Sequence, residues 1–327
     1  MADDPRITEP PPAVRSEISA LRTALAGAIP PRMVDRNVLI ATWNLREFGD
    51  LTKRWESSPG DTPKRNLRDV ALIAEIVRQF DLIAIQEVQG NLRSLRHLMK
   101  ALGPSWGFLL TDTSGGDFSG NERLAFVFDT QRVKPSGLAG ELVIPFESLN
   151  ASGPGDLTRQ FARPPYAVSF ETASTTFVLV TLHVLWGKAP AERIPELRAI
   201  ANWLATWARR ESDWGHNLIC LGDFNIDRKD DALFQAFTST GLKPPDALND
   251  VRRTIFQTQS TPHFYDQIAW FHDSTDGHPM LELSPREAGS FDFVPLTLGQ
   301  AGAKTKEQLS FRISDHYPLW AKFAIAT

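Results

Sequence analysis

Chemically useful side chains stand at the junctions between apolar runs and their polar neighbours. Four apolar runs end in such residues: Asn44, Glu87, His183 and Asp223, with Asn225 two positions beyond the last. Four other runs begin just after one: Glu122, Arg163, Asp266 and the pair Asp315-His316. Any one strand can end in a polar residue, but acids, amides and histidines at so many junctions indicate one catalytic site.

The donor atoms of this set suit a hard divalent cation and a pair of proton carriers. Carboxylate and amide oxygens dominate, and such oxygens bind Mg²⁺, Mn²⁺ or Ca²⁺. Zinc prefers clustered His and Cys, and the sequence has neither an HExxH nor a CxxC motif. An imidazole bonded to a carboxylate is a proton carrier near neutral pH, and Arg163 is suited to bind a phosphate oxygen. Together these groups favour attack of water on a phosphate ester.

The positions of these residues require strands that run in both directions. Apolar runs predict buried strands at 38–43, 81–86, 124–128, 166–170, 177–182, 217–221, 267–271 and 318–323. Helical patterns occupy 66–80, 91–102, 191–209 and 232–240. The strands between residues 123 and 182 follow one another without a helix, which favours antiparallel pairing. Polar residues that follow one set of strands and precede the other meet at one edge only if the two sets are antiparallel.

Composition is that of an ordinary globular protein. The chain has 327 residues, 42% of them hydrophobic, and its net charge of −4 provides no global field that would attract nucleic acid. We expect residues 1–36 to be an N-terminal extension with a helix at 16–29, and 37–327 to form one domain. The single cysteine, Cys220, excludes an internal disulfide. No leader sequence or membrane-spanning run is visible, so we expect a cytoplasmic monomer without stable membrane association.

Five ordered motifs resemble those of the endonuclease/exonuclease/phosphatase superfamily. They are W-N-L-R at 43–46, I-Q-E-V at 85–88, G-D-F-N at 222–225, Y-D-Q-I at 265–268 and S-D-H-Y-P at 314–318. N-E-R-L at 121–124 and F-A-R-P-P at 161–165 are similar to segments of its deoxyribonuclease I-like branch. The resemblance covers residues 36 to 326. It implies an α/β (α+β) fold, a four-layer α-β-β-α sandwich of two mixed β-sheets flanked by helices.

The same resemblance implies which residues bind a metal ion and which contact phosphate. It makes Glu87 the main ligand of Mg²⁺ or Mn²⁺, with Asn44 and Asp315 in support. It also makes Arg46 and Arg163 contacts to the substrate phosphate.

The catalytic groups that the resemblance implies are two histidine–carboxylate pairs and the polar residues of the G-D-F-N motif. The pairs are His183 with Glu122 and His316 with Asp266, while Asp223 and Asn225 orient the water and the scissile phosphate. Neither histidine is assigned as the acid or the base, and Asp223 is an alternative base.

The chain departs from the deoxyribonuclease I pattern where that branch grips duplex DNA. Gln89 stands where an arginine is expected, and Gly120 where a tyrosine is expected. Loss of a cation and a stacking ring weakens a duplex grip. The chain has instead a longer segment at 46–66, which carries four cations: Lys53, Arg54, Lys64 and Arg65. This segment is either a substituted phosphate-binding surface or a solvated charged loop.

Three functions fit the sequence to different degrees. The first is a Mg²⁺- or Mn²⁺-dependent endonuclease that hydrolyses phosphodiester bonds of DNA and, as a second substrate, RNA. The second is a phosphodiesterase or phosphatase for a lipid headgroup or small phosphate ester, for which Trp186 and Trp55 are candidate contacts. The third is a binding module without activity, which the full set of catalytic residues disfavours.

Overall fold

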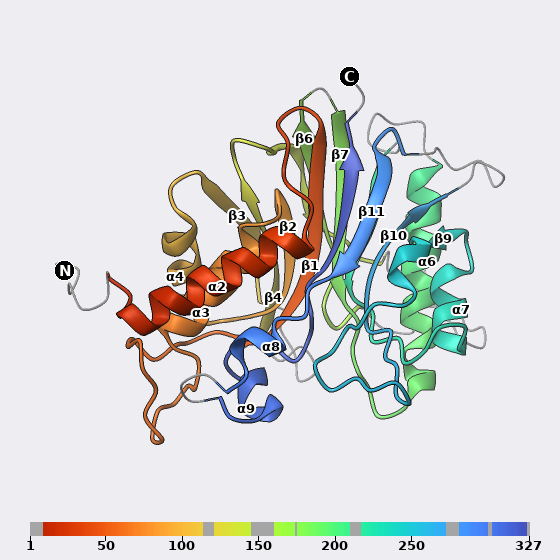
Figure 1. Cartoon of the computed structure of the whole chain (residues 1–327). Helices are drawn as coiled ribbons and strands as arrows, with labels where there is room; N and C mark the ends of the chain where they lie inside the picture. The colour runs from red at the N-terminus through yellow and green to blue at the C-terminus, as the bar shows by residue number, and fades with distance from the viewer. Residues whose placement is uncertain are drawn as a thin grey trace.

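Two six-stranded sheets form the centre of the molecule, which is described by a computed structural model over residues 9–113, 121–144, 160–173, 175–209, 217–272, 281–299 and 303–325 (Figure 1). The first sheet has the order β11-β12-β1-β2-β4-β3. Its strands are β1 Asn37–Phe48, β2 Leu82–Gln89, β3 Trp106–Leu110, β4 Glu122–Asp129, β11 Ser284–Ser290 and β12 Leu319–Ala324. The second has the order β5-β6-β7-β8-β10-β9. Its strands are β5 Lys134–Glu141, β6 Tyr166–Thr172, β7 Thr175–His183, β8 Leu218–Asp223, β9 Leu242–Lys243 and β10 Asp266–Phe271.

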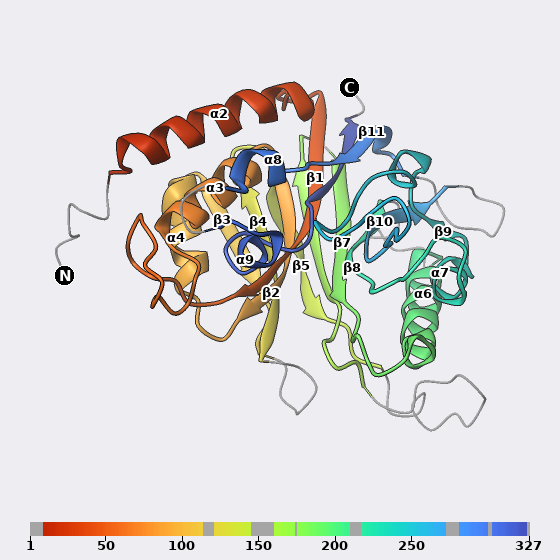
Figure 2. The same ribbon diagram turned by 60° about the horizontal axis from the view of Figure 1, so that its bottom comes forward.

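Helices cover the outer faces of both sheets, which gives the expected four-layer α-β-β-α sandwich (Figures 1 and 2). The first sheet is covered by α2 Pro12–Ala28, α3 Leu67–Val77 and α4 Arg93–Leu102. The second is covered by α6 Ile194–Ala208 and α7 Ala232–Thr238. Two short helices, α8 Val294–Thr297 and α9 Lys306–Ser310, lie at one end of the first sheet. Single 3₁₀ turns occur at Pro190–Glu192 and Asp246–Leu248.

Both sheets are mixed, as the sequence predicts. In the first sheet β1 is parallel to β2 and antiparallel to β12, and β2 is antiparallel to β4. In the second, β7 is parallel to β8, and β10 is antiparallel to β8. The carboxyl ends of β1, β2, β7 and β8 therefore lie at the same edge as the amino ends of β4, β10 and β12.

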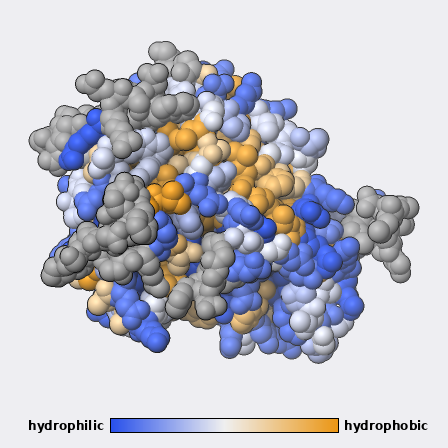
Figure 3. Space-filling model, turned by 180° about the vertical axis from the view of Figure 1, so that it is seen from behind, coloured by the Kyte–Doolittle hydropathy of each residue, from blue (hydrophilic) through white to orange (hydrophobic). Residues whose placement is uncertain are grey.

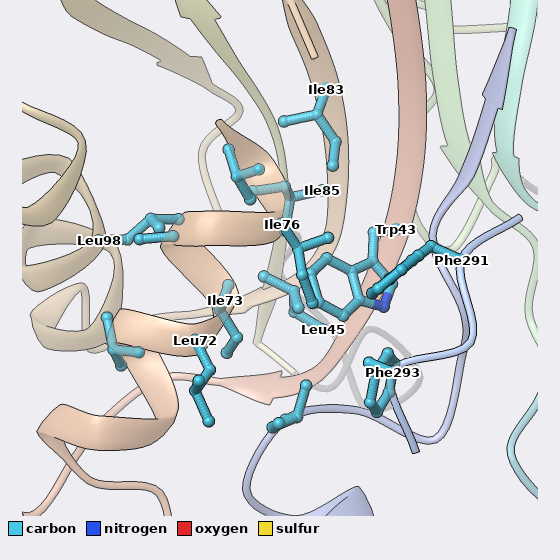
Figure 4. Close-up of a cluster of buried hydrophobic side chains, with 14 of the residues drawn as sticks. Trp43, Leu45, Leu72, Ile73, Ile76, Ile83, Ile85, Leu98, Phe291 and Phe293 are labelled. Atoms are coloured by element: carbon cyan, nitrogen blue, oxygen red, sulfur yellow. The ribbon is translucent and has the colours of Figure 1, made fainter. Parts of the chain in front are cut away.

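The strand β1 shows how the sequence builds the layers. Side chains alternate across a strand, so Val38 and Ile40 face the second sheet while Leu39 and Trp43 face the helices. Figure 4 shows Trp43 surrounded by residues of β2, α3 and the segment before α8, all buried. Its indole Nε1 donates to the backbone carbonyl of His316 at 2.8 Å. The hydrophobic core is thus hydrogen-bonded directly to one of the candidate catalytic residues.

The interior between the sheets becomes polar toward this edge. Gln86 on β2 donates its side-chain amide to the hydroxyls of Thr42 at 3.1 Å and of Thr181 at 3.0 Å. Thr181 belongs to the second sheet, so this amide joins the two layers. Because buried polar groups must find partners, the bridge fixes the relative position of the strands that end at the site.

Several elements differ from the sequence predictions. The first helix begins at Pro12, one turn before the expected Ser16, since Pro is well suited to the first turn of a helix. The sequence does not predict strands β3, β5, β9 and β11, and all four lie at the edges of their sheets. The sequences of β5 and β11 are rich in Pro, Gly and charged residues, which gives them no apolar run. The loop at 152–155 lies outside the described residues.

The surface is mixed in polarity. Figure 3 shows orange, apolar side chains between hydrophilic margins on the face turned away in Figure 1. Phe108 on β3 is one large apolar residue that is 40% exposed. Among the residues that the structure describes, no helix is both long and apolar enough to cross a bilayer.

Helix α2 packs onto α3 through a buried apolar stripe, and we propose that it is part of the folded unit. Leu25 on this stripe is fully buried. We expect Leu25→Ala to lower the free energy of unfolding by about 2–5 kcal/mol, because it removes buried methyl groups and leaves a cavity. Urea denaturation measures the change. Ser19, an exposed residue of the same helix, provides the control, and Ser19→Ala should change the free energy of unfolding by less than about 0.5 kcal/mol. An equal loss in both variants would contradict this packing.

Candidate active site

The carboxylate of Asp223 is the centre of the site. It lies at the end of β8, is 2% exposed, and accepts the side-chain amide of Asn44 at 3.1 Å. Two imidazoles face the same oxygen: His183 Nε2 lies 3.7 Å and His316 Nε2 3.9 Å from Asp223 Oδ2. The backbone amide of Asn225 donates to the other oxygen at 2.9 Å. Residues of both sheets therefore converge on one buried charge.

A glycine allows β8 to deliver this carboxylate. Gly222 has φ of 143°, and a Cβ there would lie 2.1 Å from the backbone oxygen of Leu182 on the neighbouring strand. No other residue fits so close to β7. The G-D sequence thus has a steric reason, because the strand must pass its neighbour closely one residue before Asp223.

The first histidine–carboxylate pair joins β7 to β4. His183 Nδ1 lies 3.1 Å from Glu122 Oε2, and both residues are largely buried. Arg163 holds the same carboxylate, with Nε 2.8 Å from Oε2 and Nη2 3.1 Å from Oε1. Nη1 of Arg163 is buried without a hydrogen-bond partner among the described residues. A buried free donor of a guanidinium is suited to an anionic oxygen.

The second pair joins the segment before β12 to β10. His316 Nδ1 lies 2.6 Å from Asp266 Oδ2, and both side chains are buried. The backbone amide of His316 donates to Ser314 Oγ, and its carbonyl accepts from Trp43, as described above. Arg253, fully buried, donates Nε to the backbone oxygen of Asp266 at 2.9 Å. Both members of the pair are therefore fixed through their backbones.

The predicted metal ligands lie on the β1 and β2 side of Asp223. Glu87 Oε1 accepts the amide of Asn44 at 2.9 Å, and Oε2 accepts the backbone N–H of Glu47 at 2.8 Å. Asp315 Oδ2 lies 3.3 Å from Arg46 Nη1. Asn44 thus bridges Glu87 to Asp223, and its own oxygen accepts the backbone N–H of Arg46.

These residues fit a hard divalent cation. Glu87 and Asp315 are partly exposed carboxylates that accept few hydrogen bonds, so they keep lone pairs for a metal. Within the described ranges, one other group offers clustered ligand atoms, namely Asp223, Asp266 and His316, within 4.8 Å of one another. Asp266 in that group is already bonded to His316, so we interpret it as part of a proton-carrying pair.

The electrostatics of the site favour the charged forms of both histidines and of Asp223. Burial lowers the pKa of His316, but Asp266 and Asp223 outweigh it and raise this pKa well above 6.5. The pKa of His183 is also raised, since Glu122 and Asp223 outweigh burial and the nearby Arg163. Burial would raise the pKa of Asp223, yet the two imidazoles bring it below its usual value. For Asp266, burial dominates and raises the pKa to about 6.

A buried arginine that we predicted to be a surface cation holds the backbone of the site. Arg65 is 2% exposed and donates to five backbone carbonyls: Leu45, Arg46, Glu47, Arg312 and Ile313. Burial lowers its pKa to about 10. It cannot reach a phosphate, so the phosphate-binding interpretation is wrong for this residue. Its K-R-N context in a charged loop gave no sign of burial.

The bend that Arg65 holds is strained. Arg46 and Glu47 have φ of 26° and 48°, and Glu87 opposite them has φ of 61°. Left-handed backbone in non-glycine residues costs energy and persists only where the surroundings enforce it. The bend aims the N–H of Glu47 at Glu87 and brings Arg46 beside Asp315. Arg65 is therefore a positioning residue for the predicted metal ligands.

The structure also gives the positions of three other residues. Asn225 directs its amide to the backbone oxygen of Val184, which fixes the loop after β8. His263 stacks on Tyr265, whose ring lies 5.9 Å from that of His316. Cys220 is fully buried, as expected. The Gly120 position lies outside the described residues.

The fold is the α-β-β-α sandwich of the DNase I-like class, and the sequence comparisons agree. The sequence profile of the Endonuclease/Exonuclease/phosphatase family matches residues 41–280, so the chain belongs to this family of phosphoester hydrolases.

Individual relatives carry the names of nucleases and phosphatases. The chain is 24% identical to a deoxyribonuclease of Thioalkalivibrio sp. (strain K90mix), over 87% of this chain and 70% of the relative. It is 25% identical to bovine deoxyribonuclease-1, over 93% and 97% of the two chains. The mannosyl-6-phosphatase of Bacteroides thetaiotaomicron has a similar structure, with a TM-score of 0.58, 17% identity and coverage of 88% and 99%.

The role of Arg65 predicts a large difference between two neighbouring arginines. Arg65→Met would remove a donor from five backbone carbonyls, of which that of Glu47 also accepts the N–H of Gly49, so we expect the free energy of unfolding to fall by about 2–4 kcal/mol. The Arg54 side chain is 55% exposed and pairs with Asp61, whose carboxylate also accepts the backbone N–H of Ser58. Arg54→Met should therefore cost less than about 1 kcal/mol. Equal losses in urea denaturation would show that Arg65 does not have this role.

The raised pKa of His183 predicts a pH-dependent contribution to stability. A folded-state pKa above 6.5 means that the charged imidazole stabilises the protein below about pH 6.5, and that this is lost as pH rises through the folded pKa. We expect the stability difference between wild type and His183→Gln to be larger near pH 6 than near pH 9. A stability difference between wild type and His183→Gln that stays constant, or that grows toward pH 9, would contradict this prediction.

Proposed function

We propose that the protein is a divalent-metal-dependent endonuclease that hydrolyses phosphodiester bonds of DNA, with RNA as a further substrate to test. The observation that carries the proposal is the convergence of two histidine–carboxylate pairs on Asp223, beside Glu87. Both imidazoles lie within 4 Å of the same Asp223 oxygen, so both can act on one reacting group bound beside that carboxylate. The relatives named as deoxyribonucleases support nucleic acid as the substrate.

The residues divide the work of hydrolysis between binding and proton transfer. A divalent cation at Glu87 and Asp315 would supply neutralisation of charge on the phosphoryl oxygens. The imidazolium groups of His183 and His316 point Nε2 to the centre of the site and bind phosphate oxygens. One of them donates its proton to the leaving oxygen.

Asp223 is the base in this scheme. Its lowered pKa favours the ionised carboxylate, and the raised pKa values of both imidazoles favour their protonated forms, so Asp223 is the group that can accept a proton from the attacking water. Asn44 and the backbone of Asn225 hold its two oxygens in place. Arg163 carries a free donor, Nη1, for a phosphate oxygen, and Glu122 orients its guanidinium.

A second candidate function is hydrolysis of a small phosphate ester, such as a sugar phosphate or a lipid headgroup. A cavity of about 680 Å³ lies beside His316 and includes Trp186, His263 and Tyr265 in its walls. Trp186 is 51% exposed and packs edge-on against Tyr265. Aromatic walls bind sugar rings as well as bases, so this cavity favours neither class by itself.

The two candidates are separated by a substrate panel with Mg²⁺ or Mn²⁺ and with EDTA. We expect wild type to cleave plasmid and single-stranded DNA only with the metal, and His183→Ala to be slower by a factor of about 10²–10⁴. His97 lies on α4 and lines a cavity formed with α2 and α3 that contains none of the site residues, so His97→Ala serves as the matched control and should retain activity. Turnover of sugar or lipid phosphates without DNA cleavage would replace the first proposal by the second.

A further inference from the structure

A second cavity lies on the far side of Arg46 from Asp223. Its volume is about 670 Å³, and it lies between the β1–α3 segment and α9. Figure 2 shows α9 next to this segment at the end of the molecule where the site lies. The residues that matter here are Lys64 on one wall and Lys304, Phe311 and Arg312 on the other.

The walls of this cavity are firmly held. Arg312 Nη1 donates to Ser57 Oγ at 2.5 Å, to the backbone oxygen of Lys64 at 3.0 Å and to Asp69 at 3.3 Å. The side chain of Arg312 is 5% exposed, so its hydrogen bonds join the two walls in a buried environment. Asn66 and Asp69 cap the start of α3 reciprocally, which fixes the end of the segment. The cavity is therefore a preformed feature of the fold.

Phe311 connects the cavity to the catalytic site. The Arg46 guanidinium lies 4.0 Å from the centre of the Phe311 ring, and Arg46 also contacts Ser310 and Asp315. The ring remains 37% exposed. An exposed ring with a cation on one side is a platform on which a nucleobase stacks.

The positive charges around the cavity favour a ligand with several phosphate groups, such as a nucleic-acid strand. Lys64 and Lys304 are exposed and form no ion pair with a carboxylate among the described residues. Lys64 Nζ donates to a backbone carbonyl, that of Pro59. One acid, Glu307, also lines the cavity, so the two lysines leave it cationic.

We propose that this cavity is a nucleotide subsite for an unpaired nucleic-acid strand, which extends the site past Arg46. One base stacks on Phe311, and Lys64 and Lys304 bind adjacent phosphates. The bases of a duplex are stacked on each other, so only an unpaired strand can offer a base to Phe311. The inference rests on the proposed nuclease function and means that the enzyme prefers single-stranded substrates.

Binding of a labelled oligothymidylate of about twelve nucleotides tests the subsite without any need for cleavage. Fluorescence anisotropy in EDTA, at several salt concentrations, gives the Kd and its salt dependence. We expect Phe311→Leu to raise the Kd about tenfold with an unchanged salt slope. Lys64→Ala with Lys304→Ala should raise the Kd and reduce the slope of log K against log salt by about 1.4, or 0.7 per phosphate contact.

Matched variants lie elsewhere on the surface. Phe108→Leu removes an exposed ring from β3, and Lys134→Ala with Lys243→Ala removes two exposed lysines from β5 and β9. Both should bind as wild type does. The subsite is overturned if wild type does not bind the strand, or if the cavity variants bind it as these controls do.

Cleavage assays separate this inference from the proposed function. If wild type binds through Phe311 and the two lysines but cleaves no nucleic acid, the subsite stands and the nuclease proposal fails. If wild type cleaves DNA while the cavity variants bind and cleave as the controls do, the nuclease proposal stands and the subsite fails.

Discussion

Burial of the Asp223 carboxylate is the constraint on which the rest of the structure depends. An isolated buried charge costs many kcal/mol, so it persists only with hydrogen bonds and opposite charges around it. Asn44 from the first sheet, the backbone of Asn225, and His183 and His316 from different strands provide them. The two sheets must therefore pack with these strand ends together, and the mixed strand order follows from that requirement.

The hydrophobic core and a buried arginine fix the backbone that positions the site residues. Trp43 lies in the core yet donates to the backbone of His316, so packing around the indole sets the position of an imidazole. The Arg65 guanidinium donates hydrogen bonds to carbonyls of two segments, and these bonds hold the bend at Arg46 and Glu47 in a strained conformation. Precision at the site is thus obtained from groups that never touch a substrate.

Much of the fold and the convergence of polar residues could be predicted, because both follow from local patterns. Buried strands are apolar runs, and the residue at each end is read directly from the sequence. Strand β5 and the role of Arg65 could not be predicted, for related reasons. The strand has a polar, Gly-containing sequence whose place is set by its partner β6, and the arginine is buried only because distant segments supply its carbonyls.

The central claim is that Asp223 couples both histidines through one charge. The most direct measurement is an NMR titration of the two imidazoles in wild type and in Asp223→Asn, which keeps the shape of the side chain and removes its charge. The account predicts that the pKa values of His183 and His316 both fall in the variant, since Asp223 raises both. A pKa change in one histidine alone, or in neither, would contradict it.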